Sequence, residues 1–134
     1  MTTTSAMIES TPADIGFDRE KLAAGIDACF ECAQTCTACA DACLSEDMVA
    51  ELTKCIRIDL DCADQCLATG KVLSRHAACD AKLTQAVLEA CVTACKVCGD
   101  ECASHADMHA HCRICAKGCQ RCEQACRDLL EAMA

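Results

Sequence analysis

Apolar and cysteine positions recur along the chain at alternating steps of three and four residues, which is the spacing of one buried face of a helix. From Asp18 onward the sequence is rich in Ala, Leu, Glu, Lys and Cys and has few runs of β-branched residues. These residue types favour helices, and strand signals are absent. The pattern therefore predicts an all-α protein.

Short polar breaks divide this helical region into four long segments. The expected helices span residues 18–44, about 47–75, 80–104 and 108–132, and Asp107 is a plausible N-cap for the last of them. Each has about 25 residues and is therefore about 38 Å long. Connections this short make neighbouring helices antiparallel, so the sequence predicts an up-down-up-down four-helix bundle.

Residues 1–17 are expected to form an extension that precedes this bundle. Thr11 followed by Pro12 has the pattern of an N-cap with proline at the first helical position, which predicts a short helical turn that ends near Gly16. The chain of 134 residues has the length of one domain. We therefore expect two parts, an N-terminal extension at 1–17 and a cysteine-lined bundle at 18–134.

Cysteine supplies much of the apolar material of the expected core, although it is selected for its chemistry more often than for its packing. The chain has 18 Cys and two Phe but no Trp or Tyr. Seventeen of the cysteines follow the three-and-four spacing, so they are predicted to face the bundle interior together. Helix by helix, they are Cys29, Cys32, Cys36, Cys39 and Cys43; Cys55, Cys62 and Cys66; Cys91, Cys95, Cys98 and Cys102; and Cys112, Cys115, Cys119, Cys122 and Cys126. Cys79, near the turn between the second and third helices, is out of this pattern.

The two ends of the expected interior differ in chemistry. At the end that holds the second interhelical turn, Leu22, Leu73, Leu88 and Leu129 continue the buried phase and predict a hydrophobic plug. The opposite end, which we call the mouth, holds histidines and methionines. They are His105, His109, His111, Met48 and Met108. Imidazole and thioether groups both suit copper, so these side chains are candidate metal ligands. The alternative is that the histidines, which lie near helix ends, are solvated or capping residues.

Asp59 occupies an in-phase position of the second helix, where the pattern otherwise predicts a core residue. The neighbouring Ile58 is an alternative for the inward position, and Asp59 would then be a solvated acid at the helix margin. If Asp59 faces the interior, it is a candidate metal ligand or a carboxylate that assists an incoming ion.

Charge and targeting signals restrict the class of protein. The net charge of −9 and the scarcity of aromatic residues argue against a nucleic-acid partner. Residues 1–17 carry no basic residue and no apolar core of a secretory signal, and no apolar run approaches the length of a membrane span. We therefore expect a cytoplasmic protein without a membrane partner, in a compartment that keeps thiols reduced.

Disulfides, simple packing and redox catalysis each fit the cysteine pattern poorly. Cysteines three or four apart on a helix have Cβ atoms about 5–6 Å apart, whereas a disulfide needs about 3.8 Å. If the 17 thiols served only for packing, the core would hold little apolar volume. Burial of a leucine side chain contributes roughly 1.5–3 kcal/mol to stability, and burial of a thiol contributes less. A redox enzyme uses one exposed Cys-x-x-Cys pair at a helix N-terminus, whereas here five such pairs lie within the expected helices.

Metal binding is the remaining interpretation of the cysteine pattern, and Cu(I) is the metal ion that fits this pattern best. Structural zinc takes closed groups of four ligands, typically from turns, and iron–sulfur proteins usually take cysteines from loops. Cu(I) is soft, prefers thiolates and accepts low coordination numbers, so two cysteines from one helix or from facing helices suffice. A Cu(I)-to-thiolate ratio near one leaves the interior electrically neutral, whereas separate zinc tetrathiolate sites would each leave two negative charges. A thiol-based redox or copper-transfer enzyme and a zinc- or iron–sulfur-binding protein stay as alternatives.

The runs of C-x2-C-x3-C-x2-C-x3-C at Cys29–Cys43 and Cys112–Cys126 resemble those of the bacterial copper storage proteins. The resemblance covers the chain from about Asp18 to Ala134, and without a signal peptide the chain is similar to the cytosolic branch of that family. It implies a four-helix bundle that stores or buffers Cu(I), is not an enzyme and assembles into a homotetramer. A cytosolic copper chaperone would be a candidate donor of the metal.

The same resemblance assigns roles to individual residues. It implies that the 17 in-phase cysteines hold the copper and that Cys79 joins them at the plugged end. Asp59, His105, His109 and His111 are expected in the region through which copper enters the bundle.

Overall fold

The structure is a computed structural model and describes residues 2–133. Five α-helices and one 3-10 turn make up its regular structure, and no strand occurs among the described residues. The α-helices are α1 (Thr3–Ser10), α2 (Arg19–Leu44), α3 (Thr53–Leu73), α4 (Ala81–Ala103) and α5 (Ala110–Met133), and the 3-10 turn is Val49–Leu52. The predicted all-α fold is confirmed.

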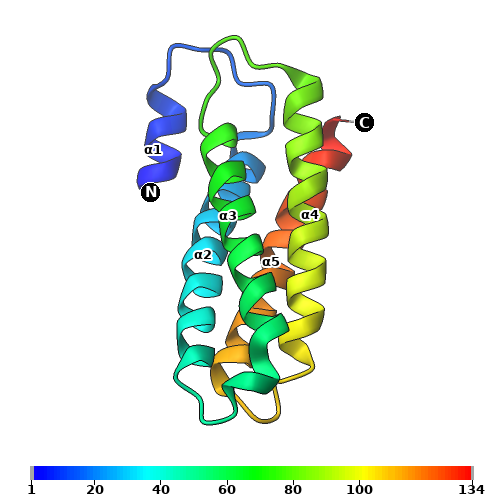
Figure 1. The fold of residues 1–134 in the computed structure, drawn as a ribbon. Coiled ribbons are helices and arrows are strands. Elements are labelled where there is room, and N and C mark those ends of the chain that lie inside the picture. The colour runs from blue at the N-terminus through cyan, green and yellow to red at the C-terminus, as the bar shows by residue number, and fades with distance from the viewer. Residues whose placement is uncertain (1, 134) are drawn as a thin grey trace.

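Helices α2 to α5 form a four-helix bundle in which each helix packs against two neighbours (Figure 1). α2 lies beside α3 and α5, and α4 lies beside the same two helices, so the four enclose one common interior. Consecutive helices run in opposite directions (Figure 1), which follows from the short connections between them. Within residues 2–133, no helix is both long enough and apolar enough to cross a membrane.

The starts of α2 and α4 follow from their N-caps. The Asp18 side chain accepts a hydrogen bond from the Lys21 backbone N–H at 3.0 Å, and Asp80 accepts one from the Leu83 N–H at 2.9 Å. Each carboxylate satisfies a backbone donor that has no partner within the helix, and its charge suits the helix N-terminus. Both starts lie where the sequence predicts them.

The last helix begins two residues later than predicted. Asp107 is exposed and lies in the turn that continues from α4, and α5 begins only at Ala110. His109 occupies the N-cap position, because its carbonyl accepts the Arg113 N–H at 3.2 Å. The turn closes on itself through His105, whose carbonyl accepts the N–H groups of Met108 and His109. This connection leaves His109 buried at the mouth.

The N-terminal helix precedes Pro12 and does not follow it, so the predicted helical turn at 12–16 is wrong. Thr2 caps α1 by accepting the Ser5 N–H at 3.1 Å, and the helix ends before Thr11. The residue before a proline is driven away from helical backbone angles, which explains this end. The Thr11 hydroxyl accepts the Ala13 N–H at 3.3 Å, a local turn contact that starts no helix.

The interior has an aliphatic end, as predicted. Leu22, Leu73, Leu88 and Leu129 are all at most 3% exposed. Leu129 and Leu73 approach the backbone of α2 closely at Gly25, where an added Cβ would lie 2.6 Å from Leu129 Cδ1 and 3.8 Å from Leu73 Cδ1. This hydrophobic plug closes the end of the bundle near the α3–α4 connection, and the cysteines occupy the interior beyond it.

Candidate metal centre

The in-phase cysteines of all four bundle helices line one interior, which we call the thiol tube. Each of these 17 side chains is at most 2% exposed, and all are free thiols. The alternating three-and-four spacing keeps successive cysteines of a helix on its inward face. The helical period and the bundle packing together therefore produce a continuous tube of sulfur.

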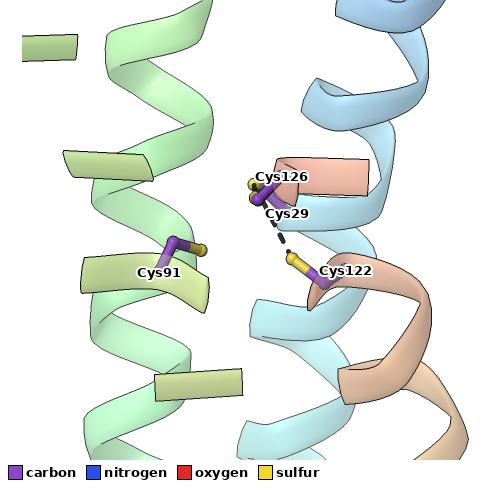
Figure 2. Close-up of side chains that lie close together, drawn as sticks. All are labelled: Cys29, Cys91, Cys122 and Cys126. Carbon is purple, nitrogen blue, oxygen red and sulfur yellow. Dashed lines mark hydrogen bonds between the residues drawn. The ribbon is translucent and has the colours of Figure 1, made fainter. Parts of the chain in front are cut away.

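Neighbouring sulfurs in the tube are separated by distances that one metal ion can bridge. Cys36 Sγ lies 3.6 Å from Cys119 Sγ, and Cys29 Sγ lies 3.8 Å from Cys122 Sγ and 3.9 Å from Cys126 Sγ. A disulfide bond would need about 2.05 Å, whereas two metal–sulfur bonds of about 2.3 Å each span these distances. Figure 2 shows Cys29 of α2 together with Cys122 and Cys126 of α5, and Cys91 of α4 points toward them.

The thiols form groups of four that share members. In each group the ligand atoms all lie within 4.8 Å of one another. Four such groups are Cys29–Cys91–Cys122–Cys126, Cys32–Cys66–Cys95–Cys122, Cys32–Cys36–Cys62–Cys119 and Cys36–Cys98–Cys115–Cys119. Since Cys32, Cys36, Cys119 and Cys122 each belong to two groups, the groups join along the tube. Shared sulfurs suit bridged Cu(I) ions better than separate tetrahedral zinc sites.

Burial favours the neutral thiol over the thiolate in the metal-free tube. Burial raises the pKa of the Cys112 thiol to about 12 and also raises the pKa of Cys43. The cause is that a charged sulfur loses its hydration when it is removed from water. A metal ion that binds here must therefore displace protons.

Asp59 faces the interior, and Ile58 beside it is only half-buried. The Asp59 side chain is 0% exposed, and its Oδ1 accepts hydrogen bonds from the thiols of Cys98 at 3.1 Å, Cys102 at 3.3 Å and Cys115 at 3.3 Å. Burial, followed by the neighbouring Cys115, raises the pKa of Asp59 to about 7. The structure therefore brings together this carboxylate and the thiols predicted to bind metal.

His111 lies at the mouth of the tube within reach of its last sulfurs. Its Nδ1 is 3.4 Å from Cys39 Sγ and 3.6 Å from Cys112 Sγ, and the same group includes Cys43. His109 is 8% exposed and stacks on His111 with ring centroids 5.3 Å apart. His105 is half-buried, and its Nε2 lies 3.4 Å from Glu101 Oε1. The three predicted histidines thus lie at the same end of the bundle, where His109 and His111 stack on each other and His105 contacts Glu101.

Glu46 also lies at the mouth and is absent from the predicted site residues. Its Oε2 lies 2.8 Å from both His109 Nδ1 and His111 Nε2. A hydrogen bond from His111 lowers the pKa of the Glu46 carboxyl. Its position in the sequence could have indicated this proximity, because Glu46 and the histidines lie at the same end of an antiparallel bundle. Of the two methionines, Met48 packs against the core, whereas Met108 is exposed.

Cys79 lies apart from the thiol tube, which departs from the expectation that it joins the other cysteines. It is exposed, and its Sγ lies 3.3 Å from Thr84 Oγ1. It lines a surface pocket together with Phe17, Leu73 and Met133. The leucine plug separates this end of the bundle from the buried thiols, because Leu88 lies between Thr84 and Cys91 along α4.

The chain is similar to proteins that bind copper. A sequence model of the copper storage protein family matches residues 18–131. The copper storage protein Ccsp of Streptomyces lividans, solved with 10 copper equivalents, is 60% identical over 97% of this chain and 99% of that chain, with a TM-score of 0.95. A structure of a cytosolic copper storage protein from the same organism with five coppers is 64% identical over 84% of this chain and 93% of that chain, with a TM-score of 0.83. The Cu(I)-bound copper storage protein BsCsp3 is 36% identical over 80% and 95% of the two chains, with a TM-score of 0.71.

Proposed function

This chain belongs to the copper storage protein family, and we propose that it stores many Cu(I) ions in the cytosol on the thiols that line its bundle. The observation that carries this function is the interior lined by 17 buried free cysteines, many of which form groups of four that share sulfurs. The related Streptomyces protein is a cytosolic copper storage protein, which supports the same compartment here. Soft thiolates in pairs and larger groups match the coordination that Cu(I) prefers.

We assign the storage ligands to the thiol tube and to two groups that contact it. The tube cysteines would bridge neighbouring Cu(I) ions, His111 Nδ1 would complete the group at the mouth, and Asp59 would contact ions bound by Cys98, Cys102 and Cys115. His105 and His109 belong to the uptake region at the mouth. Cys79 lies outside this store.

Copper loading exchanges protons for metal. A thiol whose charged form is disfavoured by burial releases its proton when Cu(I) binds, so the charge inside the tube changes little. The protonated thiols still pack as small apolar groups. The metal-free protein is therefore expected to keep its helices and not to depend on copper for folding.

The proposed storage role also concerns how the chain is divided into parts and how it assembles. We propose that the bundle, residues 18–134, is the storage unit, that residues 1–17 are an extension outside it, and that the protein is not an enzyme. We further propose a homotetramer that receives copper from a cytosolic copper chaperone. Exposed apolar side chains on α2 and α3, such as Phe30 and Leu67, support contacts between copies.

Anaerobic titration with Cu(I) against a competing chelator, with metal quantified per chain, tests the proposed function. We expect saturation well above about ten Cu(I) ions per chain, because bridging lets each ion use few sulfurs. Saturation at four or five metal ions would contradict this function and favour separate tetrathiolate sites. Circular dichroism of the metal-free protein should show a folded helical chain, and a random coil would argue for a chain that folds only around metal.

A further inference from the structure

One carboxylate oxygen contacts both of the stacked imidazole rings at the mouth, at the lower end of the bundle in Figure 1. Glu46 lies in the α2–α3 connection, and its Oε2 is 2.8 Å from His109 Nδ1 and 2.8 Å from His111 Nε2. A carboxylate oxygen has two lone pairs and can accept two donors. Glu46 therefore links the connection after α2 to the start of α5.

These contacts determine which nitrogen of each ring carries the proton. Two lone pairs facing each other at 2.8 Å would repel, so the nitrogen beside the carboxylate oxygen must carry the hydrogen. The other nitrogen of His109, Nε2, is buried and has no hydrogen-bond partner among residues 2–133. The opposite tautomer would bury an unsatisfied N–H at Nε2 and would also remove the donor that faces Glu46. It is disfavoured on both counts.

Each ring is then left with one nitrogen lone pair that Glu46 does not use. For His111 this nitrogen is Nδ1, which lies 3.4 Å from Cys39 Sγ and 3.6 Å from Cys112 Sγ. For His109 it is the unpartnered Nε2. A neutral imidazole binds a metal through such a lone pair, and a carboxylate on the opposite nitrogen fixes the tautomer and the ring orientation.

We propose that Glu46 is a positioning residue for copper uptake, which holds His109 and His111 in the tautomers that leave His109 Nε2 and His111 Nδ1 free to bind Cu(I). This proposal rests on the proposed storage function, since it names the residue that prepares the mouth of the same store. In this arrangement Glu46 acts through the two rings, because its Oε2 faces His109 Nδ1 and His111 Nε2.

Nitrogen-15 NMR of the imidazole rings in the metal-free protein tests the tautomers without any copper. In the wild type we expect His109 to be protonated at Nδ1 and His111 at Nε2, and in Glu46→Ala we expect both rings to populate mixed tautomers. Asp47→Ala is the matched control, because it removes the same charge from an exposed neighbour in the same turn. Opposite or doubly protonated rings in the wild type, or unchanged rings in Glu46→Ala, would overturn the proposal.

Stopped-flow mixing with Cu(I) then tests the role in uptake. Loss of a residue that orients a ligand typically costs on the order of 10-fold or more, so the fast phase of loading should slow by about 10-fold in Glu46→Ala. Asp47→Ala should change it by no more than about 2-fold, because an exposed charge is screened by salt. Equal slowing in both variants, or none in Glu46→Ala, would refute positioning. If the wild type took up only a few ions, the storage function would fail, while the NMR result would still decide the role of Glu46.

Discussion

The buried carboxyl of Asp59 makes the free energy of unfolding of the metal-free protein depend on pH. Its carboxyl is fully buried among thiols, and its pKa is raised from 3.8 to about 7. Below pH 3.8 the acid is protonated in both the folded and the unfolded chain, so it adds no cost. As the pH rises toward 7, the unfolded chain loses this proton while the folded chain keeps it. The free energy of unfolding therefore falls with rising pH.

Replacement of Asp59 by Asn should remove this pH dependence. The wild type should lose about 3 kcal/mol more than Asp59→Asn between pH 4 and pH 7, since each pKa unit corresponds to about 1.4 kcal/mol and both ends of this range lie close to one of the two pKa values. Urea unfolding of both reduced, metal-free proteins over this pH range measures the difference, and groups common to both cancel. Parallel stability curves would show that Asp59 ionises in the folded chain as easily as in the unfolded one.

Cys36 and Cys79 provide a matched comparison between a thiol inside the tube and one outside it. Cys36 Sγ lies within 3.9 Å of the sulfurs of Cys32, Cys98, Cys115 and Cys119, whereas Cys79 is exposed beyond the plug. Cys36→Ser should lower the capacity by at least about one Cu(I) per chain, because a hydroxyl is a poor ligand for a soft ion. Cys79→Ser should leave it unchanged. Chelator-competed titration of both variants checks this, and an equal loss would place Cys79 in the store.

For the helices, the sequence predicts the features that a repeated pattern marks, and it misses contacts that single residues make in the connections. The starts of α2 and α4 could be predicted because an N-cap aspartate and a long cysteine period point to the same place. The start of α5 could not, since the preceding turn is held by backbone hydrogen bonds to the His105 carbonyl that no periodicity reveals. The same holds for Glu46, whose contact with His109 joins two connections far apart in sequence. Such contacts depend on how the bundle closes.

The helix α1 illustrates an element that contributes to stability without reaching the site. It packs against α2 and buries Ile8 at 3% exposure, and Arg19 Nη1 donates a hydrogen bond to the Ile8 carbonyl at 3.3 Å. Deletion of residues 1–10 should lower the free energy of unfolding by roughly 1.5–3 kcal/mol, the value of one buried aliphatic side chain. Chemical denaturation measures this loss. Copper capacity should stay the same, and a reduced capacity would show that α1 belongs to the storage unit.

For the whole molecule, the charge of the tube links copper storage to pH. Seventeen buried thiolates without metal would be strongly destabilising, so the metal-free tube holds protonated thiols near neutral pH. Each Cu(I) that binds should then release about one proton, and affinity should weaken as the pH falls. Anaerobic Cu(I) addition in weak buffer with a pH indicator measures protons released per ion, with a matched addition to buffer alone as the control. We expect about one proton to be released per Cu(I) ion over most of the titration, because each ion replaces one proton of equal charge. A ratio far below one would mean that many sulfurs are already ionised in the metal-free protein, and the tube would then require other positive charge to remain folded.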